Sequence, residues 1–138
     1  MHVLTAQELH NLGMNMVGKE LQNMGYEFVA INSKLKKHPQ FVLFKKEEQT
    51  IFVLVKVSNN IQSPGEYDSV WMETFKTHAK AQNAKVWFAG IGIANSESID
   101  LPVLKDRPYY VTFEGFKEII LSIYTTFYHV NTYNGNKY

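Results

Sequence analysis

The strongest feature of the hydrophobic pattern is Thr50–Ser58, a run that is apolar on both faces until a lysine interrupts it. Because side chains alternate along a strand, Leu54 and Lys56 share one face and the odd-numbered residues share the other. A strand with two apolar faces is usually a central strand that helices cover on each side. The pattern therefore predicts a buried core strand, with Lys56 close to its end.

A first helix is predicted over roughly residues 6–24, where apolar side chains recur at helical spacing. Thr5 and Glu8 fit a capping box at its start, and Gly25 is a natural stop. Gly13 and Gly18 each cost about 1 kcal/mol relative to alanine inside a helix, unless a neighbouring element packs closely against them.

The elements around the core strand follow an order typical of a mixed sheet. Tyr26–Ile31 is a short aromatic and β-branched run that predicts a strand, and Gln40–Lys45 predicts a second strand in an antiparallel hairpin with the core strand. A helix is predicted from Ser63 to about Asn83, and Lys85–Ala94 is a further apolar run. A helix of this length between two strands implies a right-handed parallel crossover.

The last third of the chain is predicted to add one strand and one helix. Asn95–Pro108 is polar and broken by prolines, so it predicts a loop, and Tyr109–Thr112 predicts a strand. From Phe113 to Phe127 apolar residues recur at helical spacing and predict a third helix, which packing must stabilise because it is rich in β-branched and aromatic residues. We expect one domain over residues 1–130 and a flexible tail over residues 131–138.

Composition narrows the classes of function. The chain has 138 residues, 45% of them hydrophobic, and its 14 basic and 13 acidic residues give a formal charge of +1. Such a balance supplies no overall field that attracts nucleic acid or a membrane, so binding of that kind requires a local patch. The absence of cysteine excludes disulfides and thiolate sites, and the five histidines show no close metal-ligand spacing. The N-terminus lacks a signal-like pattern and no apolar stretch is long enough to span a membrane, so we expect a cytoplasmic protein with no membrane partner.

The order helix, strand, hairpin strand, core strand, helix, strand resembles the restriction-endonuclease-like fold of the PD-(D/E)xK nuclease superfamily. Residues 21–26 and Asn32 resemble the end of the first helix and the asparagine after the first strand in small predicted endonucleases related to Holliday-junction resolvases. Ile51–Lys56 is similar to their Val-Phe-Val-Glu-Val-Lys strand. The resemblance implies an α/β fold with an αβββαβ core, a mixed central sheet flanked by helices, and an extra C-terminal strand and helix.

The same resemblance implies that the metal-binding acids are missing. In that superfamily an aspartate on the second strand and a glutamate two residues before the lysine hold a metal ion. Carried over by position, the aspartate falls at Phe41, with Gln40 as the nearest polar residue, and the glutamate falls at Leu54. The first-helix glutamate falls near Asn15, so only Lys56 is retained.

Magnesium requires hard oxygen ligands, generally one or two carboxylates with water and substrate phosphate. Leucine and phenylalanine provide none, so we expect no metal or cofactor at the usual place and favour a protein that is not an enzyme. Carboxylates elsewhere would restore magnesium-dependent hydrolysis if the fold brought them to Lys56. The candidates for such an active site are Lys56, Glu20, Asp68 and Glu73.

Basic residues gather in the loop before the second strand. If this loop faces the same way as the core-strand lysine, the two form a patch that contacts phosphates, and each neutralised charge adds to a salt-dependent binding energy. The candidate nucleic-acid or anion-binding residues are Lys34, Lys36, Lys37, His38 and Lys56. Lys45 and Lys46 at the next turn would extend the patch. Alternatively, the charged turns are only solvated, and Lys56 lays its methylenes along apolar neighbours with its ammonium in water.

Three hypotheses remain open from the sequence. The first is a non-catalytic member of the nuclease-like fold that acts as a binding or assembly module, contacts DNA or RNA, and forms a homodimer through the aromatic third helix. The second is a divergent metal-dependent nuclease with relocated carboxylates. The third is a protein-interaction domain with no nucleic-acid role, which the near-zero net charge favours.

Overall fold

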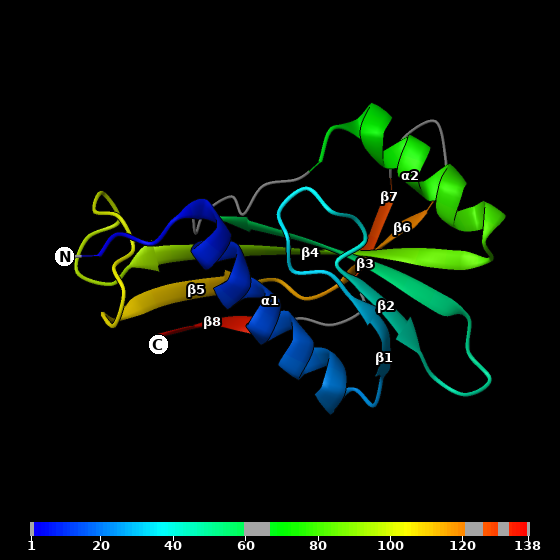
Figure 1. Ribbon diagram of the computed structural model, residues 1–138, viewed down its shortest axis with the longest axis horizontal. Coiled ribbons are helices and arrows are strands. Elements are labelled where there is room, and N and C mark those ends of the chain that lie inside the picture. The colour runs from blue at the N-terminus through cyan, green and yellow to red at the C-terminus, as the bar shows by residue number, and fades with distance from the viewer. Residues whose placement is uncertain (1, 60–66, 121–125, 130–132, 138) are drawn as a thin grey trace.

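The computed structural model describes residues 2–59, 67–120, 126–129 and 133–137. One sheet runs through the molecule with a helix on each side (Figure 1). The elements are α1 (Ala6–Asn23), β1 (Glu27–Ile31), β2 (Phe41–Phe44), β3 (Thr50–Ser58), α2 (Ser69–Ala81), β4 (Ala84–Asn95), β5 (Tyr109–Phe113), β6 (Lys117–Ile120), β7 (Thr126–His129) and β8 (Tyr133–Lys137). Neither described helix is long and apolar enough to cross a membrane.

The sheet is mixed, and its central pair is parallel. Its main path runs β1-β2-β3-β4-β5-β8, with β6 paired to β4 and β7 paired to β6. Only β3 and β4 are parallel among the described pairs, and α2 connects them as the predicted crossover helix. The α/β class, the αβββαβ order and the hairpin of β2 with β3 are confirmed.

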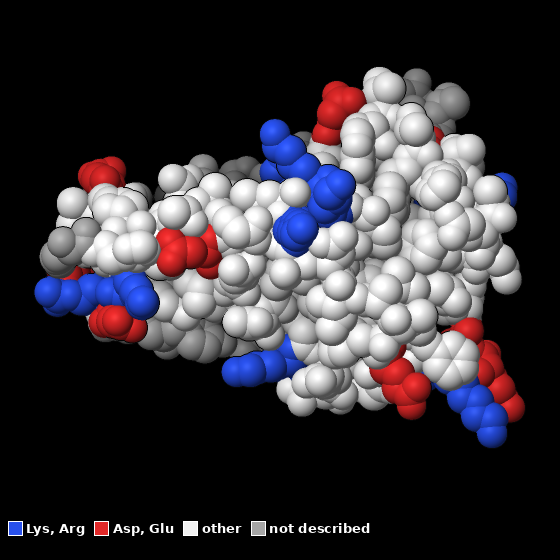
Figure 2. Space-filling model, viewed as in Figure 1, with Lys and Arg blue, Asp and Glu red and all other residues white. Residues whose placement is uncertain are grey.

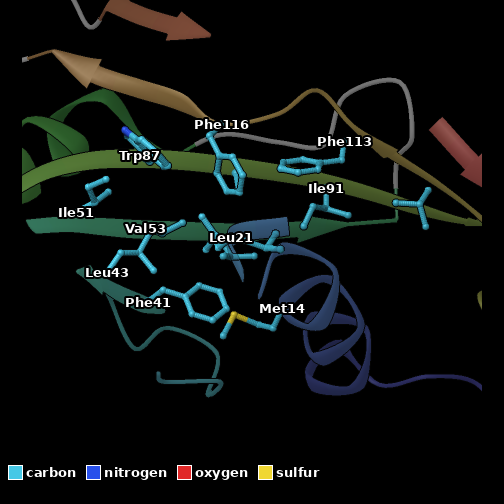
Figure 3. Close-up of a cluster of buried hydrophobic side chains, with 14 of the residues drawn as sticks. Met14, Leu21, Phe41, Leu43, Ile51, Val53, Trp87, Ile91, Phe113 and Phe116 are labelled. Carbon is cyan, nitrogen blue, oxygen red and sulfur yellow. The ribbon is translucent and has the colours of Figure 1, made fainter. Parts of the chain in front are cut away.

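The two faces of β3 bury two separate cores, as its apolar pattern predicts. Ile51, Val53 and Val55 pack with residues of α1 in the larger core. Figure 3 shows Met14 and Leu21 of α1 in this cluster of buried side chains. Phe52 and Leu54 point the other way and pack with residues of α2. The helices therefore cover opposite faces, and Leu54 lies on the face that α2 covers.

The helix boundaries agree with local capping chemistry. Thr5 and Glu8 form the predicted capping box of α1. The predicted start of the second helix at Ser63 lies outside the described residues, and α2 begins at Ser69 with Asp68 as its N-cap. The buried residues of α2 are Met72 and Ala79, and His78 is exposed.

The predicted third helix over 113–127 is wrong where the structure describes this segment. Lys117–Ile120 and Thr126–His129 are strands, β6 and β7, and residues 121–125 lie outside the described part of the chain. β5 pairs with the second half of β4 and β6 with the first half, so the segment runs antiparallel along one strand. Its aromatic and β-branched residues favour a strand over a helix. The predicted homodimer through an aromatic third helix therefore loses its basis.

The predicted flexible tail also needs correction. Tyr133–Lys137 forms β8 and pairs antiparallel with β5, so this part of the tail belongs to the sheet. The rest of the predicted tail, residues 131, 132 and 138, lies outside the described residues.

Gly115 allows a direct test of the strand assignment, because it lies in the kink between β5 and β6 with φ of +89°. Alanine is strained in this conformation, so we expect Gly115→Ala to destabilise the fold by about 1–2 kcal/mol, measured by urea unfolding. Inside a helix the same change would stabilise the protein by about 1 kcal/mol. Glu114→Ala, at the exposed neighbour, is the control and should stay within about 0.5 kcal/mol of the wild type.

Candidate functional site

The positions that the resemblance assigns to metal-binding acids do not share a face. Phe41 pairs with Val53 across the β2–β3 ladder, and directly paired residues lie on the same face of a sheet. Phe41 therefore packs on the α1 side, whereas Leu54 is fully buried on the α2 side. Even with acids at both positions, this pair could not hold one metal ion.

Gln40, the nearest polar residue, completes the sheet instead. Its Oε1 accepts a hydrogen bond of 2.8 Å from the backbone N–H of Val55, and its Nε2 donates one of 2.8 Å to the carbonyl of Lys37. The backbone N–H of Val55 is a donor that would otherwise pair with a neighbouring strand. The side-chain amide of Gln40 therefore accepts the hydrogen bond that a further residue of β2 would accept. The buried Gln40 side chain thus has a structural role, because its two hydrogen bonds join the end of the β1–β2 loop to β3.

Lys56 lies beyond Leu54 on the same face, at the end of the buried part of β3. Its Nζ is 4.9 Å from the centroid of the Tyr67 ring, just ahead of α2. The aromatic face attracts the ammonium but supplies no negative charge. Within the described ranges, Lys56 has no ion pair. The Lys56 side chain is half-buried at this end of the strand.

His38 joins the β1–β2 loop to this lysine through Tyr67. The Tyr67 hydroxyl donates a hydrogen bond of 3.3 Å to the carbonyl of Val55 and lies 3.1 Å from Nε2 of His38. Since the hydroxyl proton is used on Val55, the oxygen accepts from His38, and Nε2 carries the imidazole proton.

An aromatic stack on α2 supports the same group of residues. Tyr67 stacks on Trp71 at 4.6 Å, and Trp71 stacks in turn on Phe75 at 5.3 Å between ring centroids. The His38 ring packs edge-on against Trp71 at 4.8 Å. These contacts fix the end of the loop against α2. Tyr67 and Trp71 belong to this candidate site but were not among the residues predicted for it; their i, i+4 spacing with Phe75 was the available signal.

The electrostatics of the site reflect unbalanced positive charge. Burial lowers the pKa of His38 below its usual value, and the charge of Lys56 lowers it further. Burial also lowers the pKa of the buried His10 on α1, with a smaller contribution from His38. Burial raises the pKa of the Tyr67 hydroxyl, which therefore stays neutral. Both histidines are held in their neutral forms in the free protein.

The loop lysines lie beside this group. Lys34, Lys36 and Lys37 are all exposed, and Figure 2 shows basic side chains gathered over the β1–β2 loop. The loop is tied to the start of α1 through Gln7: its Nε2 donates to the Ser33 carbonyl at 2.7 Å, and its Oε1 accepts from the Leu35 N–H at 3.0 Å. The lysines thus project from a loop that is anchored at α1 and at α2.

Lys45 and Lys46 do not extend the patch, because they follow β2 at its other end. Lys45 is tied down there: its Nζ donates a hydrogen bond of 2.9 Å to the Met24 carbonyl and lies 4.8 Å from the centroid of the Tyr26 ring. The predicted basic surface is therefore limited to the β1–β2 loop and Lys56.

The structure does not bring the candidate acids to Lys56 as a metal site. Glu20 lines a groove between α1 and β5, on the opposite face of the sheet. Asp68 is exposed and caps α2, accepting a hydrogen bond of 3.1 Å from the Trp71 N–H. Glu73 is half-buried on α2. Among the described residues, no three histidines or acids lie close enough together to hold a metal ion.

Together the fold and the site define an α/β protein with a mixed sheet and a cationic cluster at the end of its core strand. Residues 7–119 match the family described as a domain of unknown function (DUF8840), and the chain belongs to that family. The matched range contains every residue of the cluster. No curated protein and no solved structure matches the chain.

Proposed function

We propose that this protein is a non-catalytic member of the restriction-endonuclease-like fold that binds the phosphate backbone of DNA or RNA through its β1–β2 loop. One observation supports this most directly. Three exposed lysines, Lys34, Lys36 and Lys37, project from a loop that His38 fixes beside Lys56. In this arrangement the positive charges that attract a phosphate are present, whereas a buried leucine stands at the position of the metal-binding glutamate.

The burial of Leu54 argues against hydrolysis by this site. Metal-assisted cleavage needs carboxylates that hold the ion and space for the water that it activates. The Leu54 side chain is 0% exposed and packs among residues of α2, β4 and β6. This position therefore provides no carboxylate ligand and no space for a metal-bound water. Lys56 alone can bind or orient a phosphate, but it cannot assemble a magnesium site.

A local patch also accounts for binding by a chain whose formal charge is only +1. The attraction to phosphates is sequence-independent and releases counterions, so it needs several cations on one surface rather than a high overall charge. Lys34, Lys36 and Lys37 have no acidic partner in the described part of the chain. Their charges are therefore available to a ligand.

The test is a salt titration of binding to a labelled oligonucleotide. We expect the wild type to bind with a dissociation constant of about 10⁻⁴–10⁻⁶ M, with affinity falling as salt rises. The triple variant Lys34→Ala, Lys36→Ala, Lys37→Ala should bind at least about tenfold more weakly and reduce the slope of log K against log salt by about 2 to 3.

The control removes equal charge elsewhere, through alanine at the exposed Lys46, Lys80 and Lys105 on other elements. It should bind like the wild type. An equal loss in both triple variants would show that the loop is not the binding surface, and no binding at low salt would leave only protein partners. Cleavage that needs magnesium or manganese and is abolished by Lys56→Ala or Glu20→Gln would overturn the non-catalytic assignment.

A further inference from the structure

The hydrogen bonds around His38 leave one ring nitrogen for a ligand. Nε2 donates to the Tyr67 oxygen, since that hydroxyl gives its own proton to the Val55 carbonyl. The neutral ring therefore has a lone pair at Nδ1, for which no partner exists among the described residues. In this form Nδ1 cannot donate to a phosphate oxygen. It becomes a donor only after it takes up a proton.

The groups that face His38 from the surrounding elements are neutral or positive. Lys56 comes from β3, His10 from α1, and the neutral Tyr67 from the segment before α2, while Lys37 precedes His38 in the loop. Among the described residues, His38 and Lys56 contact only neutral groups, and the exposed carboxylate of Asp68 accepts from the Trp71 N–H instead. Protonation of His38 therefore lacks the negative charge that would favour it.

A bound phosphate would supply this missing charge. Beside Lys56 it would offset the ammonium that opposes a second positive charge, and its oxygen would accept from Nδ1–H. Both effects favour the imidazolium in the complex. The buried Nε2 of His10 has no hydrogen-bond partner within the described part of the chain. His38 lies close enough to lower the pKa of His10, so His10 belongs to the same electrostatic group.

We propose that Lys56 and His38 form a phosphate subsite in which ligand binding is coupled to protonation of His38 at Nδ1, so that affinity rises as the pH falls. This inference rests on the proposed function and adds proton linkage to it. Lys56 supplies one positive charge, and His38 supplies a second charge and a donor only when the ligand is present. The loop lysines add a salt-dependent attraction to the phosphate backbone.

The direction of the pH dependence follows from the protonation state of His38 in the free protein and in the complex. In the free protein the pKa of His38 lies below its usual value near 6.5 because of burial and Lys56, so the ring is neutral at pH 7. Binding raises this pKa, and the complex takes up a proton. Between the two values, affinity increases by up to about tenfold for each pH unit of acidification. Above the pKa of the complex, no proton is taken up and affinity no longer depends on this residue.

The experiment measures binding of a short single-stranded oligonucleotide at constant salt from about pH 5.5 to 8.5, with and without a terminal 5′-phosphate. Wild type and His38→Gln are compared, because the glutamine amide can donate to Tyr67 but does not titrate. We expect affinity to rise toward low pH in the wild type and to be nearly flat in the variant. Calorimetry in two buffers of different ionisation enthalpy should show proton uptake by the wild type only.

The possible outcomes separate the two proposals. A pH dependence confined to the 5′-phosphorylated oligonucleotide assigns a terminal phosphate to the subsite, and an equal dependence for both assigns a backbone phosphodiester. Equal pH profiles and equal proton uptake in wild type and His38→Gln would refute the subsite while leaving backbone binding intact. Failure of the wild type to bind at any pH would instead refute the proposed function. His10→Gln, in which His38 is retained, should preserve the proton uptake.

Discussion

Leu54→Glu is expected to destabilise the protein by about 3–5 kcal/mol, because it buries a carboxylate where the structure holds a leucine. Leu54 is 0% exposed and packs with Met72 of α2 and Val86 of β4. Lys56, two residues further along the same face, has its ammonium over the Tyr67 ring. The new acid must therefore remain buried without a partner or open the contact between α2 and the sheet. Urea unfolding measures the loss.

The same variant tests whether the space around residue 54 is filled, or whether a metal site there lacks only its carboxylate ligand. Leu54→Met, which nearly conserves volume, is the control and should cost less than about 1.5 kcal/mol. Because apolar side chains fill the space around residue 54, adding manganese should not raise the melting temperature of Leu54→Glu. A stable Leu54→Glu variant whose melting temperature rises with manganese would contradict this packing. It would show that one substitution restores an open metal site.

The core elements could be predicted because their signals are local. β3 is apolar on both faces, and the long apolar run of β4 after a helix leaves few alternatives to a parallel crossover. The helix predicted over residues 113–127 was wrong because apolar residues in this segment also recur at helical spacing. Spacing cannot show that Gly115 adopts a positive φ or that β6 pairs with Val86–Phe88, which is distant in sequence.

The candidate site was only partly visible in the sequence. The strand pattern predicted that Leu54 and Lys56 share a face, and the loop composition indicated the basic residues. The position carried over to Phe41 was wrong as a partner for Leu54, because the face of a strand residue depends on register and not on distance along the chain. The contact of His38 with Tyr67 joins residues 29 positions apart. Such a contact arises from tertiary packing, so no local pattern could predict it.

The two glycines of α1 should respond in opposite directions to the same substitution. A Cβ at Gly13 would clash with Cγ2 of Val57, and it would lie 3.4 Å from Cβ of Val57 and 3.4 Å from Cδ1 of Ile91. The short Val57 side chain is fixed on β3 and cannot withdraw without moving the strand or the helix. Overpacking of this kind costs about 1–3 kcal/mol, and moving a helix against two strands places it at the upper end. After the gain of about 1 kcal/mol in helix propensity, Gly13→Ala should destabilise by about 2 kcal/mol.

Gly18→Ala is the matched control, because Gly18 is five positions further along the same helix. Its Cβ would meet the Phe41 ring at 3.5 Å, an ordinary contact, and Gly18 lines a groove beside β1 that has room for a methyl group. This variant should keep the propensity gain and stabilise the protein by about 1 kcal/mol. Relative to the wild type, the urea midpoint of Gly13→Ala should therefore fall and that of Gly18→Ala should rise. Equal stabilisation by both would show that α1 does not approach β3 at Gly13, and the α1-side core would then need a different packing.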